Sequence, residues 1–402
     1  MSFNQPQFPS VGIETEFDLV TNFGVRQTVA YLRKAFPADT QDEIAPHTLE
    51  SGTTGANNFA TAMQTIISQF SKFQRQLKIN DHIFPFGSLP NARTEQEQRQ
   101  ALQFLQIHNN EYYQHLLERD GSIVATNLNV NGLQFHVGQL GEANMEQMLK
   151  RYNVMRYLIP IFQGLSSSSP IRNSKFSGYA SERVLAKKQL PKSGVPSYLR
   201  NEEHLKTLLD TLPDGVRKSL SPGYFWLRYP RTDLGTLELC SMDMIPDIKL
   251  TGALLDLYQR LCIKIDQTEY QNLPTDVFGN HEYLQDSDFI NTNLESINLM
   301  SKTLQDTSIV LPIQDNIVFT KWLENIFKWI GDISSETAKY KCEDYLPNFL
   351  AQGTYSEQII AELKNLEIIT NHDSQIITPQ MMPDVLNVYN ELSQQNLFSK
   401  LN

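Results

Sequence analysis

The segment Val11–Val20, VGIETEFDLV, decides how the rest of the chain is interpreted. Its apolar side chains alternate with the acidic Glu14, Glu16 and Asp18. A period of two is typical of a β-strand with one buried face, so we predict a strand whose three carboxylates share the other face. Neighbouring like charges disfavour their mutual ionisation unless solvent or a cation intervenes. A solvated face is the usual outcome for such a strand, and a divalent metal site is the alternative.

Two later segments repeat the pattern. The segment 130–140 alternates Gln134 and His136 with apolar residues, and the segment 235–241 sets Glu238 between two leucines. Polar faces of separate strands can meet in one cleft. Mg²⁺ prefers oxygen ligands and keeps waters and substrate phosphates, so two or three carboxylates for each ion suffice. Zinc fits less well, because no Cys/His spacing supports a tetrahedral site.

Helical periodicity and turn residues assign much of the remaining chain. Helices are predicted at 58–77, 94–118, 144–158 and 249–265, the third ending or kinking at Pro160. A further strand at 224–229 is followed by a turn, and Thr354 with Glu357 forms a capping box for a late helix. The irregular alternation of helices and strands predicts an α+β fold with a mostly antiparallel sheet.

Residues 166–198 are rich in Ser, Gly and Pro, which predicts a long loop. The four serines at its start are expected to cap a helix end, because no His or Asp is tied to them as in a catalytic triad. This predicted loop is basic although the protein is acidic, and its cations are Arg172, Lys175, Arg183, Lys187, Lys188 and Lys192.

The bulk properties exclude several classes of protein. A chain of 402 residues with a net charge of -11 is unsuited to general binding of nucleic acid or an anionic membrane. Its three widely spaced cysteines fit a reducing compartment, so we expect a cytoplasmic protein. We predict a catalytic part at 1–268 and a mostly helical part at 269–402. The second part is expected to cover the sheet, and a contact within a homo-oligomer is the other role left open for it.

Five segments, taken in order along the chain, are similar to those of a known family. They are VGIETEF at 11–17, LESGTT at 49–54, GLQFHVG at 132–138, SSSSPIRNSKFSGYASER at 166–183 and GTLELCSMD at 235–243. In this order they resemble the glutamate-cysteine ligase type 2 family of carboxylate-amine ligases, part of the glutamine-synthetase-like superfamily. The resemblance is strong from Val11 to about Leu261 and weak beyond.

The resemblance implies a curved antiparallel sheet with helices on its outer face, an active site on its polar face, and ATP and Mg²⁺ as cofactors. It implies one Mg²⁺ held by Glu16, Glu43 and Glu50, and another by Glu14, Gln134 and Glu238. It also implies ATP contacts from His136, Gln134 and Arg172. Catalytic contacts to the substrate carboxylate or the transferred phosphoryl group would come from Glu238, Arg183 and Arg228.

The implied reaction joins a carboxylate, such as that of glutamate, to an amine through an acyl phosphate, with small amino acids and amines as substrates. The sequence has no phosphate-binding G-x-x-x-x-G-K-[ST] loop, so metal bridging must hold the ATP phosphates. In the family an arginine follows two residues after the strand glutamate, whereas this chain has Cys240. Arg228, Arg231 or the basic segment could compensate. A lapsed ligase that binds nucleotide or a partner protein, and a metal-dependent amide hydrolase, stay open as alternatives.

Overall fold

The computed structural model describes residues 8–42, 45–53, 58–107, 130–139, 144–189, 194–210, 226–228, 235–286, 288–312, 316–370 and 374–397. Its main sheet has the strand order β2-β3-β1-β5-β8, with β4 also pairing with β1. These strands are β1 Val11–Thr21, β2 Gln41–Asp42, β3 Thr48–Gly52, β4 Asp81–Phe84, β5 Gly132–Gly138 and β8 Thr236–Asp243. Every pairing among them is antiparallel, which confirms the predicted fold class.

The described helices fill most of the remaining structure. They are α1 Ala30–Ala35, α2 Phe59–Gln76, α3 Glu95–Ile107, α6 Met145–Ser166, α7 Glu182–Lys188, α8 Glu202–Asp210, α10 Ile248–Gln267, α11 Thr275–Phe278, α12 Asp288–Asn298, α13 Phe319–Ile330, α14 Cys342–Gln352, α15 Tyr355–Asn365 and α16 Met382–Asn396. Small sheets join β6 Ile171–Arg172 and β7 Lys175–Phe176 with β11 Gln375–Ile376, and β9 Ser308–Ile309 with β10 Ile317–Val318. Among the described residues, no helix is long and apolar enough to cross a membrane.

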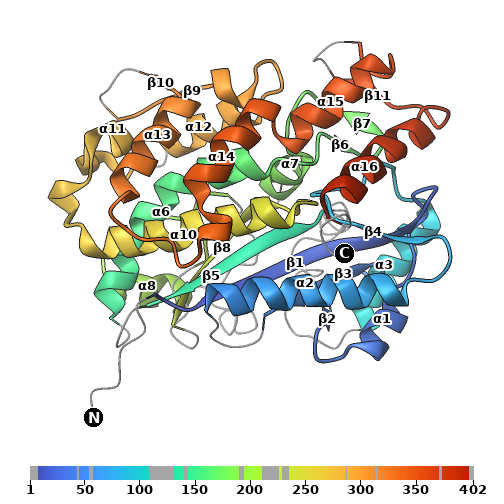
Figure 1. The fold of residues 1–402 in the computed structure, drawn as a ribbon, viewed down its shortest axis with the longest axis horizontal. Helices are drawn as coiled ribbons and strands as arrows, with labels where there is room; N and C mark the ends of the chain where they lie inside the picture. The colour runs from blue at the N-terminus through green and yellow to red at the C-terminus, as the bar shows by residue number, and fades with distance from the viewer. Residues whose placement is uncertain are drawn as a thin grey trace.

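Helices α2, α6 and α10 cover the apolar face of the main sheet (Figure 1). Phe17 of β1 is fully buried, and its ring centroid lies 5.3 Å from that of Phe70 on α2. Phe135 of β5 stacks on Tyr258 of α10. Because burying one such side chain stabilises the fold by about 1.5–3 kcal/mol, this alternation holds the apolar face inward and leaves the polar face for the site.

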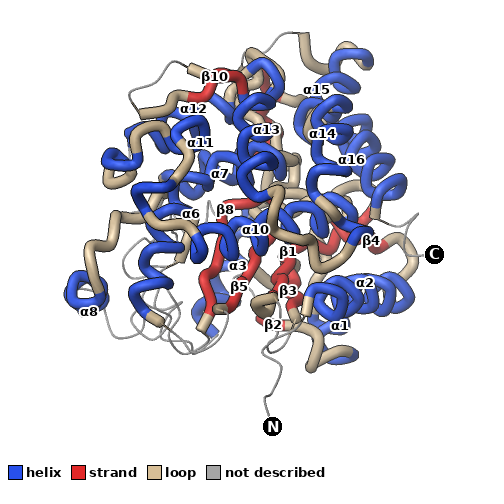
Figure 2. The backbone as a smooth tube through the Cα atoms, turned by 60° about the vertical axis from the view of Figure 1, so that its left-hand side comes forward, coloured by secondary structure: helices blue, strands red, loops and turns tan. Residues whose placement is uncertain are grey.

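The helices after Gln267 extend the same core. In Figure 1 they are coloured orange and red and lie mostly above the sheet, and Figure 2 shows the strands below them in red. One hydrophobic cluster runs from Val11 to Leu397. A second cluster brings Tyr389 of α16 against Phe84 and Phe86, with ring centroids 5.4 and 4.8 Å apart. The functional division at residue 268 remains a proposal.

Two predictions from the sequence need correction. Of the end or kink predicted at Pro160, the end is wrong, because α6 continues to Ser166. A proline inside a helix costs about 3 kcal/mol locally, and the burial of every α6 side chain from Arg151 to Ser166 compensates for this cost. The segment 166–198 is not one loop, since it contains β6, β7 and α7.

Two other predicted elements lie only partly in the described chain. Of the strand predicted at 224–229, the described residues 226–228 contribute a single bridge between Leu227 and Leu239. Of the helix predicted at 94–118, the described part is α3.

Candidate functional site

The polar face of the main sheet carries acidic and other polar side chains from four adjacent strands. Glu16 on β1 lies directly opposite Glu50 on β3, and Glu14 lies opposite Gln134 on β5. His136 on β5 lies opposite Glu238 on β8. Directly opposed residues of an antiparallel pair have Cβ atoms about 4.5–5.5 Å apart. The registers therefore place all these side chains on one connected surface, which we call the carboxylate face.

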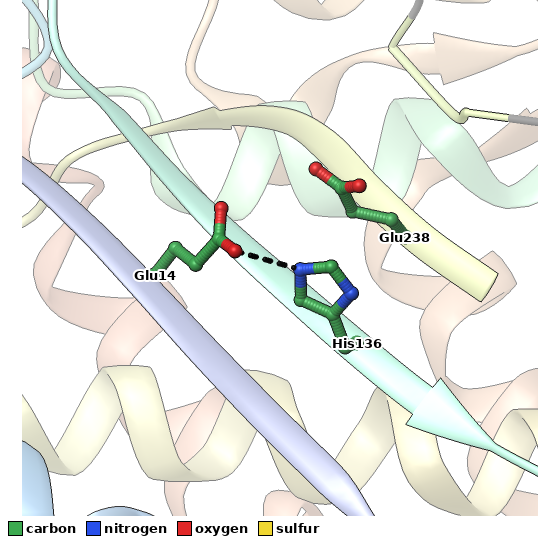
Figure 3. Close-up of side chains that lie close together, drawn as sticks. All are labelled: Glu14, His136 and Glu238. Atoms are coloured by element: carbon green, nitrogen blue, oxygen red, sulfur yellow. Dashed lines mark hydrogen bonds and ion pairs between the residues drawn. The ribbon is translucent and has the colours of Figure 1, made fainter. Parts of the chain in front are cut away.

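Glu14, His136 and Glu238 point toward one another from three strands (Figure 3). Nε2 of His136 lies 3.1 Å from Oε1 of Glu14. One ligand atom from each of the three side chains lies within 4.8 Å of the other two. Burial alone would lower the pKa of His136, but the hydrogen bond to Glu14 and the charge of Glu238 outweigh burial and raise this pKa. A positive charge between the two carboxylates is therefore favoured, on the imidazole or on a cation.

Glu16 is held in place by two donors from β5. The backbone N–H of Gly132 donates to Oε2 of Glu16 at 2.5 Å, and Nε2 of Gln134 donates to Oε1 at 2.8 Å. Gln134 is buried, and its own Oε1 has no hydrogen-bond partner in the described part of the protein. A buried amide oxygen without a donor is suited to a cation, because a cation would supply the missing partner.

Glu238 is fully buried at the edge of this face. Nη1 of Arg228 lies 2.7 Å from Oε1 of Glu238, and the thiol of Cys240 donates to the same oxygen at 3.1 Å. Burial, followed by the charge of Glu238, raises the pKa of Cys240 well above its usual value. This raised pKa favours the neutral thiol, which agrees with a packing role and argues against a thiolate nucleophile.

A β-bulge in β8 brings Asp243 to the same face. Phe135 pairs with Leu239 and Leu133 with Met242, so the single residue between them on β5 faces two residues of β8. Beyond the bulge, Asp243 lies opposite Gly132. In a regular strand, Asp243 and Glu238 would face opposite sides, since they are an odd number of residues apart. The extra residue places both carboxylates on one side.

Asp243 anchors the serine run and the start of α7. It is buried and accepts hydrogen bonds from the hydroxyls of Ser169 and Ser181, at 2.5 and 2.7 Å, and from the backbone N–H of Ser168 at 3.1 Å. The hydroxyl of Ser181 also accepts from the backbone N–H of Val184, which caps α7. Burial raises the pKa of Asp243, although Arg183 and these hydrogen bonds oppose the rise.

Helix α7 directs Arg183 onto the carboxylate face. Arg183 is buried, and its Nη2 donates to the carbonyl of Cys240 at 3.1 Å. A Cβ at Gly132 would lie only 2.4 Å from this Nη2 and 3.2 Å from Oε2 of Glu16. The guanidinium therefore occupies the space above Gly132, close to Glu16.

The same helix brings Lys187 toward the site. Lys187 is half-buried and lies one helical turn beyond Arg183. Burial and then the charge of Arg183 lower the pKa of Lys187 to about 8, while Glu16 raises it. From the sequence, Lys187 was expected only as one cation of a basic loop. Its spacing from Arg183 would have placed the two cations on one face if the helix had been recognised.

The remaining residues proposed from the sequence lie in different surroundings. Arg172 lies on β6 of a small sheet, where its Nε is 3.6 Å from Glu182. Asp18 is fully buried beside the hydroxyl of Thr48 at 2.7 Å, and burial raises its pKa. Glu43 lies outside the described residues. The structure thus gathers Glu14, Glu16, Glu50, Gln134, His136, Glu238, Arg183 and Arg228, and it gives Arg172 and Asp18 partners elsewhere.

The donor set suits Mg²⁺. Carboxylate and amide oxygens are the ligands that this hard cation prefers, and the face offers them from Glu14, Glu16, Glu50 and Gln134. Among the described residues of this group, His136 offers the one nitrogen that can ligate a metal ion. The described residues therefore fit Mg²⁺ better than zinc.

Comparisons with other proteins show which family this chain resembles. The model of Glutamate-cysteine ligase family 2 (GCS2) matches residues 10–351. A Nocardia farcinica protein named "Putative glutamate--cysteine ligase 2-2" is 26% identical over 272 residues, which cover 64% of this chain and 68% of that protein. A similarly named Nocardioides protein is 31% identical over 136 residues, but the match covers only 34% of this chain and 35% of its own.

Two solved structures share the fold at low sequence identity. The glutamate–cysteine ligase of Francisella tularensis, solved in complex with AMP, has a TM-score of 0.59 at 13% identity, covering 100% of this chain and 91% of its own. A bifunctional glutathione synthetase from Pasteurella multocida has a TM-score of 0.59 at 14% identity, covering 96% of this chain and 53% of its own. The family match covers the carboxylate face and α7, and the chain belongs to glutamate-cysteine ligase family 2.

Proposed function

We propose that this protein is an ATP-dependent ligase that joins a carboxylate to an amine, with glutamate as the donor and a γ-glutamyl amide as the product. The observation that carries the proposal is the gathering of four glutamates, Gln134 and two arginines on one face, in a chain that belongs to a glutamate–cysteine ligase family. The Francisella structure was solved with AMP, which supports an adenine nucleotide as the second substrate here.

The proposed reaction has two steps. A carboxylate oxygen of the donor attacks the γ-phosphorus of ATP, the bond to the bridging oxygen breaks, and its electron pair leaves on ADP. The amine nitrogen then attacks the acyl carbon, the acyl–oxygen bond breaks, and phosphate leaves as the nitrogen loses a proton. Neither step needs a covalent protein nucleophile, which agrees with the neutral thiol of Cys240.

The side chains would have separate tasks. Glu14, Glu16, Glu50, Gln134 and Glu238 would hold Mg²⁺, which when bound neutralises negative charge on the ATP phosphates. Arg183 and Arg228 would contact the donor carboxylate or the transferred phosphoryl group, because planar guanidinium groups bind carboxylate and phosphate with two hydrogen bonds. His136 would contact the phosphates beside Glu14.

Three free cysteines support a reducing cytoplasm as the location.

A substrate screen tests the proposal. The full chain is incubated with Mg²⁺ and ATP and with pairs of carboxylates and amines, while ADP, phosphate and the amide product are measured. We expect ADP to form in equal amount to the amide, and only when donor, amine and ATP are all present. Glu238→Gln is the control for contaminating ATPase. Amide hydrolysis without ATP would instead support the hydrolase, and the absence of ADP with every pair would support the lapsed ligase.

A further inference from the structure

We propose that Lys187 contacts the γ-phosphate of ATP and the phosphoryl group during its transfer, as a second cation of α7 beside Arg183. This inference rests on the proposed ligase function. It adds a residue that the candidate set of metal ligands and arginines does not contain.

The position of Lys187 is fixed by the anchoring of α7. Two side chains four residues apart on a helix lie on the same face, so Lys187 follows Arg183 toward the carboxylate face. The first turn cannot move freely, since Ser181 caps it and is itself bonded to Asp243 on β8. The helix is therefore tied to the strand that carries Glu238, and Lys187 is held over the same strand.

The cations around Lys187 favour the binding of an anion there. Its ammonium interacts electrostatically with two other cations, Arg183 and Arg228, as well as with Glu16. Within the described parts of the chain, Lys187 makes no ion pair or hydrogen bond, whereas its neighbour Lys188 pairs with Glu295 at 3.5 Å. Three cations that repel one another are stabilised when a ligand with several negative charges lies between them.

Arg183 supplies an independent observation. It is 1% exposed, and its Nε and Nη1 have no hydrogen-bond partner among the described residues, although Nη2 is bonded to Cys240. Leaving buried charged donors unpaired is costly, so such atoms point to a bound group that accepts hydrogen bonds. Two guanidinium donors and the Lys187 ammonium suit the several oxygens of a phosphate better than a single carboxylate.

The cysteine at position 240 of β8 is a reason to expect a phosphate-binding cation, Lys187, on α7. Cysteine has no positively charged form, so β8 offers no cation at position 240, which is buried. Lys187 lies close enough to Cys240 to interact with it electrostatically and brings an ammonium there from α7. As the donor carboxylate attacks and ADP leaves with the electron pair of the broken P–O bond, negative charge shifts onto the oxygens that Lys187 would contact.

The experiment compares Lys187→Met, Lys187→Arg and the neighbouring Lys188→Met in the full chain. We expect Lys187→Met to lower kcat about 10²-fold, as when one donor to a transition-state oxyanion is removed. Lys187→Arg should restore most of this loss, and Lys188→Met should behave as wild type. Calorimetry gives a second readout. Lys187→Met should weaken binding of Mg²⁺ with the non-hydrolysable ATP analogue AMP-PNP about tenfold, and binding of AMP much less.

Other outcomes would overturn the inference. Unchanged kcat and unchanged AMP-PNP binding in folded Lys187→Met would exclude a phosphate contact, and so would equal weakening of AMP and AMP-PNP. Thermal melting checks folding, and Lys187→Gln takes the place of the methionine variant if the latter is unfolded. If wild type turns over no substrate pair, the ligase proposal fails, while the two binding measurements still decide whether Lys187 contacts the phosphate.

Discussion

At Gly132 the backbone itself contacts the candidate site. Its N–H bonds Glu16, and the absence of a side chain leaves room for Nη2 of Arg183. We expect Gly132→Ala to displace the guanidinium, because the new Cβ would lie 2.4 Å from Nη2. A displacement of about 1 Å can cost about 10²-fold in rate.

Steady-state kinetics with the substrates found in the screen measure this effect. Gly331→Ala is the matched control, since Gly331 lies at the end of α13 outside the carboxylate face. An active Gly132→Ala enzyme with an unchanged KM for ATP would mean that the position of Arg183 is not required.

Glu238 and Cys240 are two residues apart on β8 and should respond differently to substitution. Glu238→Gln removes the charge that pairs with Arg228 and could hold a cation, so we expect turnover to fall by about 10²-fold or more. Cys240→Ala removes a neutral packing group and should leave much of the activity. Initial rates of ADP release distinguish the two variants. If Cys240→Ala were less active than Glu238→Gln, the roles assigned to these two residues of β8 would be wrong.

At the level of secondary structure, the cap of α7 couples folding to the site. Ser181→Ala removes a hydrogen bond to Asp243 and another from Val184, so we expect a loss of about 1–3 kcal/mol in the free energy of unfolding. The KM for ATP should also rise, because Arg183 and Lys187 depend on this helix. Urea denaturation and kinetics measure the two effects.

Asn58→Ala provides the comparison for the α7 cap. Asn58 caps α2 through the N–H of Thr61, and this helix covers the opposite face of the sheet. We expect its substitution to lower stability by about 1 kcal/mol without changing KM. Equal kinetic effects from both caps would indicate that general loosening, and not the position of α7, alters the site.

The sequence predicted regular elements better than irregular ones. The period of two identified β1, β5 and β8, because each has one apolar and one polar face, and thereby placed Glu14, Gln134 and Glu238 on a common surface. The bulge in β8 breaks this period without any glycine or proline to mark it, so Asp243 was missed. Helix α7 was read as a loop since it is short and follows a segment rich in Ser and Gly, and Lys187 was missed with it.

At the level of the whole molecule, Arg260 ties the C-terminal helices to the core. This buried side chain of α10 donates to Oε1 of Glu343 on α14 at 2.6 Å and to the carbonyl of Ile330 on α13 at 3.2 Å. Burial opposes ionisation of Glu343, but the hydrogen bonds from Arg260 outweigh burial and lower its pKa below the ordinary value of 4.5. Below pH 4.5 the unfolded chain thus binds more protons at this position, and the stabilisation is lost as pH falls through the folded pKa.

Glu343→Gln should therefore lower the free energy of unfolding at pH 7 by about 1–3 kcal/mol and flatten the decline of this free energy as pH falls below 4.5. Burial raises the pKa of the neighbouring Asp256, and protonation of this group stabilises the folded protein as pH falls. The contribution of Glu343 is therefore isolated by the difference in unfolding free energy between wild type and Glu343→Gln. Denaturation curves across this pH range measure it. Glu324→Gln, which removes an exposed ion pair with Lys321, should have little effect. If the unfolding free energies of wild type and Glu343→Gln changed in parallel with pH, the pair of Arg260 and Glu343 would not be a source of the pH dependence.

The packing of α16 on Phe84 and Phe86 has a consequence for biosynthesis. Tyr389, which covers both rings, leaves the ribosome long after they do. During this interval Phe84 and Phe86, which pack on each other, lack the aromatic partner that contacts both of them in the folded protein. If translation pauses before Met382, this incompletely covered aromatic surface can bind chaperones or other nascent chains. Rapid synthesis of α16 would shorten the time for which the surface is incompletely covered.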